Sequence, residues 1–469
     1  MTREPDRAVR IANVSGFFGD RLSAAQEMVE GGPIDVLTGD WLAELTMLIL
    51  ARQRMKHGPG SGYARTFLTQ MEQVLGTCLD RGIRVVSNAG GLDPQGCADA
   101  LHAKAQEWGL SPRIAVVTGD DLSGRIDELR ESGEELRNID TGESLEDVGA
   151  HLLTANAYLG GEPIARALSA GADVVITGRV TDAALVVGPA AWWHGWSFSP
   201  DHLDELAGAI VAGHAIECGA QVTGGNYSFF TDVPGLEHPG FPIAEVAADG
   251  SSVITKHEGT GGLVSVGTVT AQLLYEIGAP SYANPDATAR FDTIRLEQVG
   301  PDRVRISDVR GDAAPATLKI AGTYLGGFRN ALSLVVTGTD GRAKADLALR
   351  TITGLDLDAV HGMTPRQAAA ESTLECQELI VSWEPTAHAD PETTADAQSH
   401  LRLVVRDMDP KRVAKPFTTR VVEAALSTYP GMFPTTPPGE PTPFGVYWPT
   451  TVHRDRVPSI VTMDGEILR

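Results

Sequence analysis

Six short apolar runs punctuate the first 180 residues, and each is followed by a polar, glycine-marked cluster. The runs are Arg10–Ser15, Asp35–Thr38, Arg84–Val86, Arg113–Thr118, Thr154–Ala157 and Asp173–Thr177. Between them lie longer segments with apolar residues at helical spacing, such as Tyr63–Arg81, which ends at Gly82. Strands that alternate with helices are typical of parallel sheets, because parallel strands need long crossover connections. The pattern predicts an α/β domain with mostly parallel strands, and it leaves both an open sheet and a barrel-like arrangement possible.

The hydrophobic pattern changes beyond Phe241, where short β-rich runs with tight turns replace the long helical segments. Examples of these runs are Ser252–Lys256, Thr293–Val299, Arg303–Asp308, Leu318–Leu325 and Ala331–Thr337. Helical spacing returns at Asp346–Thr353 and Val413–Ser427. We therefore expect two domains, an α/β domain over residues 1–235 and an α+β domain over residues 236–469.

The composition favours a globular protein and excludes some function classes. The 469 residues are 42% hydrophobic and carry a net charge of −23, which argues against nucleic-acid binding. The apolar stretch Leu42–Ala51 is far too short to span a membrane, and Met1–Arg10 has no apolar segment typical of a signal peptide. The four cysteines show no C-x-x-C spacing, so we expect reduced thiols and a cytoplasmic location.

Polar residues follow the predicted strands where the carboxyl ends of a parallel sheet would form a site. The carboxylates Asp120, Asp121 and Asp182 could transfer protons or hold a divalent cation, although a carboxylate there can also cap a helix. Arg179 could bind a carboxylate or a phosphate, or pair with one of these carboxylates. The substrate-binding candidates at this edge also include Asn88, Gly90 and Gly91.

Two further segments carry candidate chemistry. Glu217 and Cys218 lie beside His214 and are a candidate base and nucleophile, with a buried structural cysteine as the alternative. Two glycine-rich loops could present backbone N–H groups to an oxyanion, or could be plain turns. The candidate binding residues of these loops are Gly224, Gly225, Asn226, Lys256, Gly259, Thr260, Gly261 and Gly262.

Several of these segments resemble the acyclic terpene utilisation protein AtuA family, and the resemblance covers nearly the whole chain. Among the matching stretches are RIANVSGFFGDR, VVSNAGGLDPQGCADAL, GHAIECGAQVTGGNYS and FGVYWPTTV. The resemblance implies a role in the breakdown of branched acyclic terpenoids as CoA thioesters, and it establishes no catalytic residue. Some relatives look longer, with an appended small ferredoxin-like domain for which we expect no room in this chain.

Two hypotheses about function follow. In the first, the protein is an enzyme that acts on a branched acyl-CoA or a related small carboxylate by hydratase, lyase or thioester chemistry, with CoA as part of the substrate. In the second, it is a non-catalytic binding or assembly partner of an acyl-CoA carboxylase complex. The aromatic segment Trp192–Trp196 and the proline-rich segment Pro430–Pro443 motivate the second hypothesis. In either case we expect a homo-oligomer.

Overall fold

The chain forms two compact units in the computed structural model, which describes residues 7–58, 60–386 and 392–468. The larger unit is built from the segment that ends at Thr323 together with the segment that begins at Tyr447, and the smaller unit is Tyr324–Val446. The division that we expected near residue 235 lies inside the larger unit, because strands on both sides of that position pair in one sheet.

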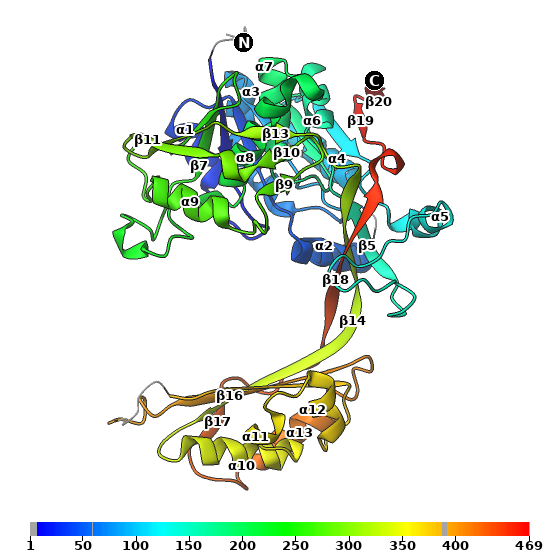
Figure 1. Ribbon diagram of the computed structural model, residues 1–469, viewed down its shortest axis with the longest axis vertical. Coiled ribbons are helices and arrows are strands. Elements are labelled where there is room, and N and C mark those ends of the chain that lie inside the picture. The colour runs from blue at the N-terminus through cyan, green and yellow to red at the C-terminus, as the bar shows by residue number, and fades with distance from the viewer. Residues whose placement is uncertain (1–6, 59, 387–391, 469) are drawn as a thin grey trace. The chain divides into compact units, whose positions relative to one another are not determined.

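A mixed, open sheet of eleven strands organises the larger unit (Figure 1). Its centre is parallel, in the order β1-β2-β3-β6-β4. These strands are β1 (Val9–Asn13), β2 (Val36–Gly39), β3 (Arg84–Ser87), β6 (Val174–Thr177) and β4 (Ile114–Thr118). Five of the six predicted runs thus lie side by side, while β5 (Leu152–Ala157) pairs with β14 (Thr317–Val336) instead. The sheet has two free ends, so of the two predicted arrangements the open sheet is observed.

Antiparallel strands extend the parallel centre on both sides. On one side are β7 (Pro242–Val246), β8 (Ser252–Lys256), β12 (Arg303–Ser307) and β11 (Arg295–Gly300). On the other side, the last strands of the chain, β19 (Ile460–Met463) and β20 (Glu466–Leu468), follow β4. Residues far apart in the sequence therefore share one sheet.

Helices cover both faces of this sheet, because successive strand residues point to opposite sides. Ala12 and Val85 pack in a core with α1 (Ala24–Gly31), α3 (Arg65–Arg81) and α4 (Pro94–Glu107). Ile11 and Val86 pack in a second core with α6 (Glu162–Ser169), α7 (Ala184–His194) and α8 (Leu203–Ile216). Four further elements of this unit are α2 (Glu44–His57), α5 (Ile126–Glu131), α9 (Val266–Leu274) and a three-stranded sheet of β9 (Ser281–Ala283), β10 (Thr288–Arg290) and β13 (Arg310–Asp312).

The smaller unit has the β-α-β-β-α-β order of a ferredoxin-like fold. Its antiparallel strands lie in the order β15-β16-β14-β17, so each helical connection spans one intervening strand. The elements that follow β14 are α10 (Gly341–Thr353), α11 (Leu357–Val360), α12 (Pro365–Glu371), β15 (Glu378–Glu384), β16 (Ser399–Asp407), α13 (Lys415–Ala424) and β17 (Met432–Pro434). This unit is inserted between the two segments of the larger unit, whereas our expectation concerned a ferredoxin-like domain appended in some relatives.

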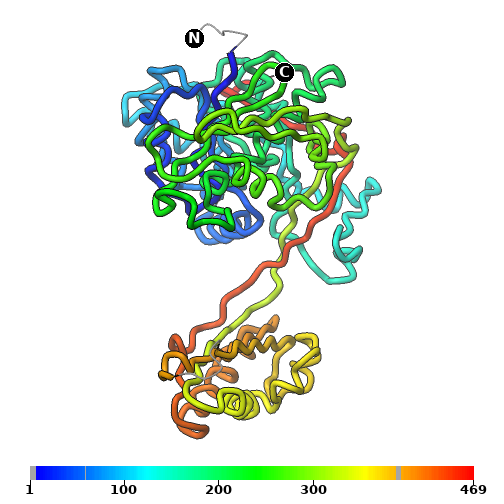
Figure 2. The backbone as a smooth tube through the Cα atoms, turned by 60° about the vertical axis from the view of Figure 1, so that its left-hand side comes forward, coloured from blue at the N-terminus to red at the C-terminus, as the bar shows by residue number. Residues whose placement is uncertain are grey.

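Two long strands connect the units. The segments Leu318–Leu325 and Ala331–Thr337, predicted as separate strands, lie almost entirely in the single strand β14. The strand β18 (Thr442–His453) pairs with β14, and Figure 2 shows the two strands running side by side. Over the described residues, no helix is both long enough and apolar enough to cross a membrane.

Candidate active site

The carboxyl ends of the parallel strands carry a buried network of polar side chains. Asp40, which follows β2, accepts a hydrogen bond from the Asn88 side-chain amide, which follows β3. The Asn88 oxygen accepts the backbone N–H of Trp41 at 2.8 Å, so the two strand ends are locked together. Burial, with the nearby negative charge of Asp182, raises the pKa of Asp40 well above its usual range. Burial thus favours the protonated form of the Asp40 carboxyl.

Arg179 follows β6 and is the buried cation of this network, with 3% of its surface exposed. One terminal nitrogen donates to the Leu42 carbonyl at 3.0 Å and to Asp182 Oδ1 at 2.8 Å. The guanidinium lies 4.3 Å from the centroid of the Tyr158 ring, and the Tyr158 hydroxyl donates to Glu44 at 2.7 Å. Although burial alone would lower the pKa of Arg179, the surrounding negative groups, Asp182 first, raise it. Arg179 is thus a fixed positive charge in a dry environment.

Asp120, at the end of β4, fixes the backbone around Arg179. Its Oδ2 atom accepts the Arg179 backbone N–H and the Asn156 side-chain amide, both at 2.8 Å. A Cβ atom at Gly178 would collide with this carboxylate, which explains why glycine precedes Arg179. Burial raises the pKa of Asp120 to about 6, even though both hydrogen bonds favour the carboxylate.

A second pair, His214 and Glu217, lies at the end of α8. Asn13, the last residue of β1, donates to the Ile216 and Glu217 carbonyls and brings the helix end to the edge of the sheet. His214 Nδ1 lies 2.9 Å from Glu217 Oε1, and both side chains are buried. Burial raises the pKa of Glu217 to about 7, against the opposing effect of His214. Burial alone would lower the pKa of His214, but the charge of Glu217 raises it.

The Asp182 carboxylate influences both the Arg179 network and the His214–Glu217 pair. This half-buried carboxylate acts on the pKa values of Asp40, Arg179, His214 and Glu217. Several buried atoms of the same cluster lack a hydrogen-bond partner among the described residues, and Arg179 Nε, His214 Nε2 and Glu217 Oε2 are among them. Native proteins rarely leave buried polar atoms unpaired without a functional reason. The cluster is therefore the candidate active site.

Not every predicted site residue belongs to this cluster. Asp121 is exposed and accepts hydrogen bonds from the backbone and hydroxyl of Ser123, as a turn-forming residue does. A Cβ atom at Gly90 would meet the Thr177 carbonyl, and one at Gly91 would meet Leu50, so both glycines serve close packing. Cys218 lies beside the cluster, but burial and Glu217 raise its pKa, which keeps it a thiol.

The two glycine-rich loops bond within the protein. The backbone N–H groups of Gly224, Gly225 and Asn226 donate to carbonyls of residues 220–221. In the other loop, Gly262 donates to the Pro234 carbonyl, and the next residue donates to Thr223, which joins the two loops. These bonds occupy four of the N–H groups that an oxyanion cradle would need.

The polar side chains of the second loop are likewise engaged. The Lys256 ammonium lies 3.0 Å from Asp302 Oδ2 and donates to the Thr260 carbonyl at 2.8 Å. The Thr260 hydroxyl donates to the His257 carbonyl. Gly259 adopts a left-handed φ of 75°, and a Cβ atom at Gly261 would collide with the Gly235 backbone. These contacts describe a stable turn.

Sequence reasoning missed several members of the site. Tyr158 follows β5, and Tyr282 packs against His214 with ring centroids 5.5 Å apart and ring planes tilted by 57°. The Lys319 ammonium lies 5.2 Å from the Tyr158 ring centroid and 5.6 Å from that of Tyr447. Tyr158 and Lys319 come together because β5 pairs with β14. That pairing leaves no local signal in the sequence.

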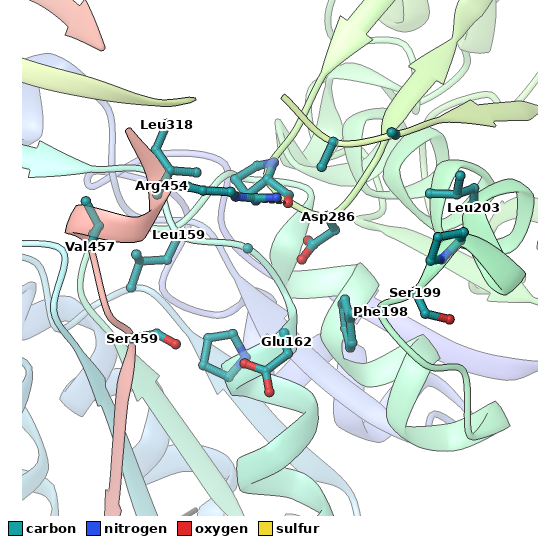
Figure 3. Close-up of a pocket in the computed structure, with 16 residues that line it drawn as sticks. Leu159, Glu162, Phe198, Ser199, Leu203, Asp286, Leu318, Arg454, Val457 and Ser459 are labelled. Atoms are coloured by element: carbon teal, nitrogen blue, oxygen red, sulfur yellow. Dashed lines mark hydrogen bonds between the residues drawn. The ribbon is translucent and has the colours of Figure 1, made fainter. Parts of the chain in front are cut away.

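A pocket of about 420 Å³ lies elsewhere in the larger unit (Figure 3). Figure 3 shows Asp286, Glu162 and Arg454 among its lining side chains. Asp286 accepts the Gly161 backbone N–H at 2.7 Å and caps the start of α6. Burial raises the pKa of Asp286 to about 6, while the capping bonds oppose the shift. We therefore assign Asp286 a structural role.

Among the side chains that the structure describes, no group of three or more His, Cys, Asp or Glu residues is arranged to hold a metal ion.

The open mixed sheet with a buried acid–base cluster at its strand ends places the protein in the broad class of α/β proteins with a strand-end site. Comparison with protein families refines this class. The family described as acyclic terpene utilisation family protein AtuA matches residues 9–463, and the chain belongs to that family. Neither the curated proteins nor the solved structures contain a match to this chain.

Proposed function

We propose that the protein is a cytoplasmic enzyme of acyclic terpenoid breakdown that adds water to, or eliminates it from, a branched unsaturated acyl-CoA. Family membership supports the pathway. The observation that carries the chemistry is the Glu217 carboxyl, whose pKa of about 7 suits a group that gains and loses protons near neutral pH. The four free cysteines are consistent with a reducing compartment.

The proposed roles follow from the charge of each group. The Glu217 carboxylate, oriented by His214, takes a proton from water, whose oxygen bonds to the β-carbon of the acyl group. The electron pair of the double bond moves onto the thioester oxygen, where Arg179 stabilises the negative charge. The protonated form of Asp40, which burial favours, then donates its proton to the α-carbon, and solvent returns the proton from Glu217 to Asp40. The reverse sequence is the elimination.

The aromatic segment Trp192–Trp196, one of the two segments that motivated the assembly hypothesis, offers it no support. Trp193 and Trp196 are buried, and their indole N–H groups donate to the carbonyls of Arg7 and Ala248. The aromatic segment therefore packs inside the larger unit, mostly on α7, and does not form an exposed loop. The geometry favours the enzyme.

The experiment that tests the proposal combines ligand stabilisation with turnover. Thermal unfolding is measured with branched unsaturated acyl-CoA thioesters, free CoA and branched carboxylates, since a ligand of the native state raises the unfolding temperature. Hydration of the stabilising thioester is then followed for wild type, Glu217→Gln and Arg179→Met. We expect turnover to fall about 10²-fold or more in both variants. Asp121→Asn, on an exposed neighbouring carboxylate, is the control and keeps its activity.

Two outcomes would contradict the proposal. One is full turnover in both Glu217→Gln and Arg179→Met. The other is the absence of stabilisation by any thioester together with co-purification of an acyl-CoA carboxylase, which would establish the assembly function instead.

A further inference from the structure

The smaller unit contains a cavity of about 660 Å³ whose wall is rich in cations. Lys411, Arg412, Lys415 and Arg420 line it, and the ten residues 411–420 contain no acidic residue. This is notable in a chain with a net charge of −23. The cavity is also lined by two carboxylates, Glu375 and Glu423, which the cations outnumber, and by the hydroxyl-bearing residues Thr373 and Thr419.

Two of the cations, Lys415 and Arg420, lie on α13, and Lys411 and Arg412 lie in the segment directly before it. Phe417 on the same helix is buried in the core of the smaller unit. The helix is thus anchored by its apolar residues, while Lys415 and Arg420 line the cavity.

The cations at the start of α13 oppose the helix dipole. The N-terminus of a helix carries partial positive charge and favours acidic residues, yet α13 begins with Lys415 and has no acidic residue in its first turn. Lys411 and Arg412 precede it directly, and the N-cap residue Ala414 has no side chain to cap the helix. A local arrangement that costs stability points to a ligand that compensates for it.

Most of the cations also lack a carboxylate partner. Arg412 lies 3.7 Å from the buried Asp407, whereas Lys411, Lys415 and Arg420 form no ion pair with any residue that the structure describes. All three are exposed. Their charges are available to an anion that enters the cavity.

We propose that this cavity binds a compound bearing at least two phosphate groups. Several cations at an uncapped helix N-terminus match the charge and geometry of phosphate oxygens. The volume is in the range of small-molecule sites. Nucleotide-type compounds and inorganic pyrophosphate share this chemistry. The site does not depend on the reaction proposed above, because it is defined and tested by binding alone.

Isothermal titration of the full chain tests the proposal with inorganic pyrophosphate, adenosine 3′,5′-bisphosphate and free CoA at fixed ionic strength. The variant Lys415→Gln with Arg420→Gln removes two exposed cations and keeps good helix formers. Arg402→Gln, at an exposed cation on β16 outside the cavity, is the control for the loss of a surface cation elsewhere in the smaller unit. We expect the affinity to fall at least about tenfold in the double variant and to stay unchanged in the control.

Each pattern of binding either supports the proposed phosphate site or overturns it. Binding of adenosine 3′,5′-bisphosphate and CoA but not pyrophosphate assigns the site to nucleotides, and binding of pyrophosphate assigns it to the phosphates alone. Absence of binding for all three compounds overturns the proposal, as does an equal loss in Arg402→Gln. Without ligand, the double variant should unfold at an equal or higher urea concentration than wild type, since it removes Lys415 from a helix N-terminus and keeps good helix formers at both positions. That measurement separates lost binding from lost folding.

Discussion

Replacing Asp120 with asparagine should stabilise the protein at neutral pH and leave its stability nearly unchanged in acid. The buried carboxyl has a pKa of about 6, against 3.8 for an ordinary aspartate. An acid with a raised pKa contributes stability below pH 3.8 that is lost as the pH rises to about 6, because the unfolded chain releases its proton first. The shift corresponds to about 3 kcal/mol above pH 6.

Asparagine at position 120 should retain both hydrogen bonds that the aspartate accepts. One oxygen of Asp120, Oδ2, accepts both hydrogen bonds, from the Arg179 backbone and from the Asn156 amide, so an asparagine oxygen can take its place. The assay is urea unfolding of wild type and Asp120→Asn at pH 4 and pH 7.5. Asp121→Asn controls for the loss of one surface charge. If Asp120→Asn is less stable than wild type at pH 7.5, the carboxylate is favoured in the fold, and the reasoning from burial is refuted.

Two further predictions concern the pH profile and the smaller unit. The hydration rate of wild type should rise with pH through about 7 as the Glu217 carboxyl ionises, and Glu217→Gln should lose that rise; the same rise in the variant would contradict the assignment. Phe417→Ala should destabilise the smaller unit by about 3–5 kcal/mol, because the ring is almost wholly buried. Urea unfolding followed by the fluorescence of Trp383, the tryptophan of this unit, measures the loss, and exposed Val422→Ala is the control. A loss under about 1 kcal/mol would contradict the packing argument.

The strand ends of the site could be predicted from the sequence because they are local features. Each buried parallel strand is a short apolar run, and the polar residue after it must lie at the edge of the sheet. This places Asp120, Arg179 and Asp182 correctly at one edge. Their partners Tyr158 and Lys319 depend on the pairing of β5 with β14, between segments more than 150 residues apart. Such a pairing has no local pattern.

The glycine-rich loops show why composition alone misleads. A glycine is needed wherever a Cβ atom would collide, whether with a ligand or with the protein itself. At Gly90 and Gly261 the neighbouring atoms belong to the chain, namely the Thr177 and Gly235 carbonyls. The sequence shows that the backbone approaches something closely, and only the structure shows what that is.

The balance of charge in the site explains why the pKa values of Asp40 and Glu217 are raised. Asp182 and Glu217 each raise the pKa of Asp40, and Asp182 also raises the pKa of Glu217. Arg179 is the permanent cation among these carboxyl groups. Burial in a medium of low dielectric constant raises the pKa values of Asp40 and Glu217, and the charge of Arg179 opposes the rise at Asp40. The Asp182 carboxylate is half-buried and lies 2.8 Å from the Arg179 guanidinium. The Glu217 carboxyl, with a pKa of about 7 beside His214, is then the group whose protonation changes near neutral pH, which is the property that acid–base catalysis requires.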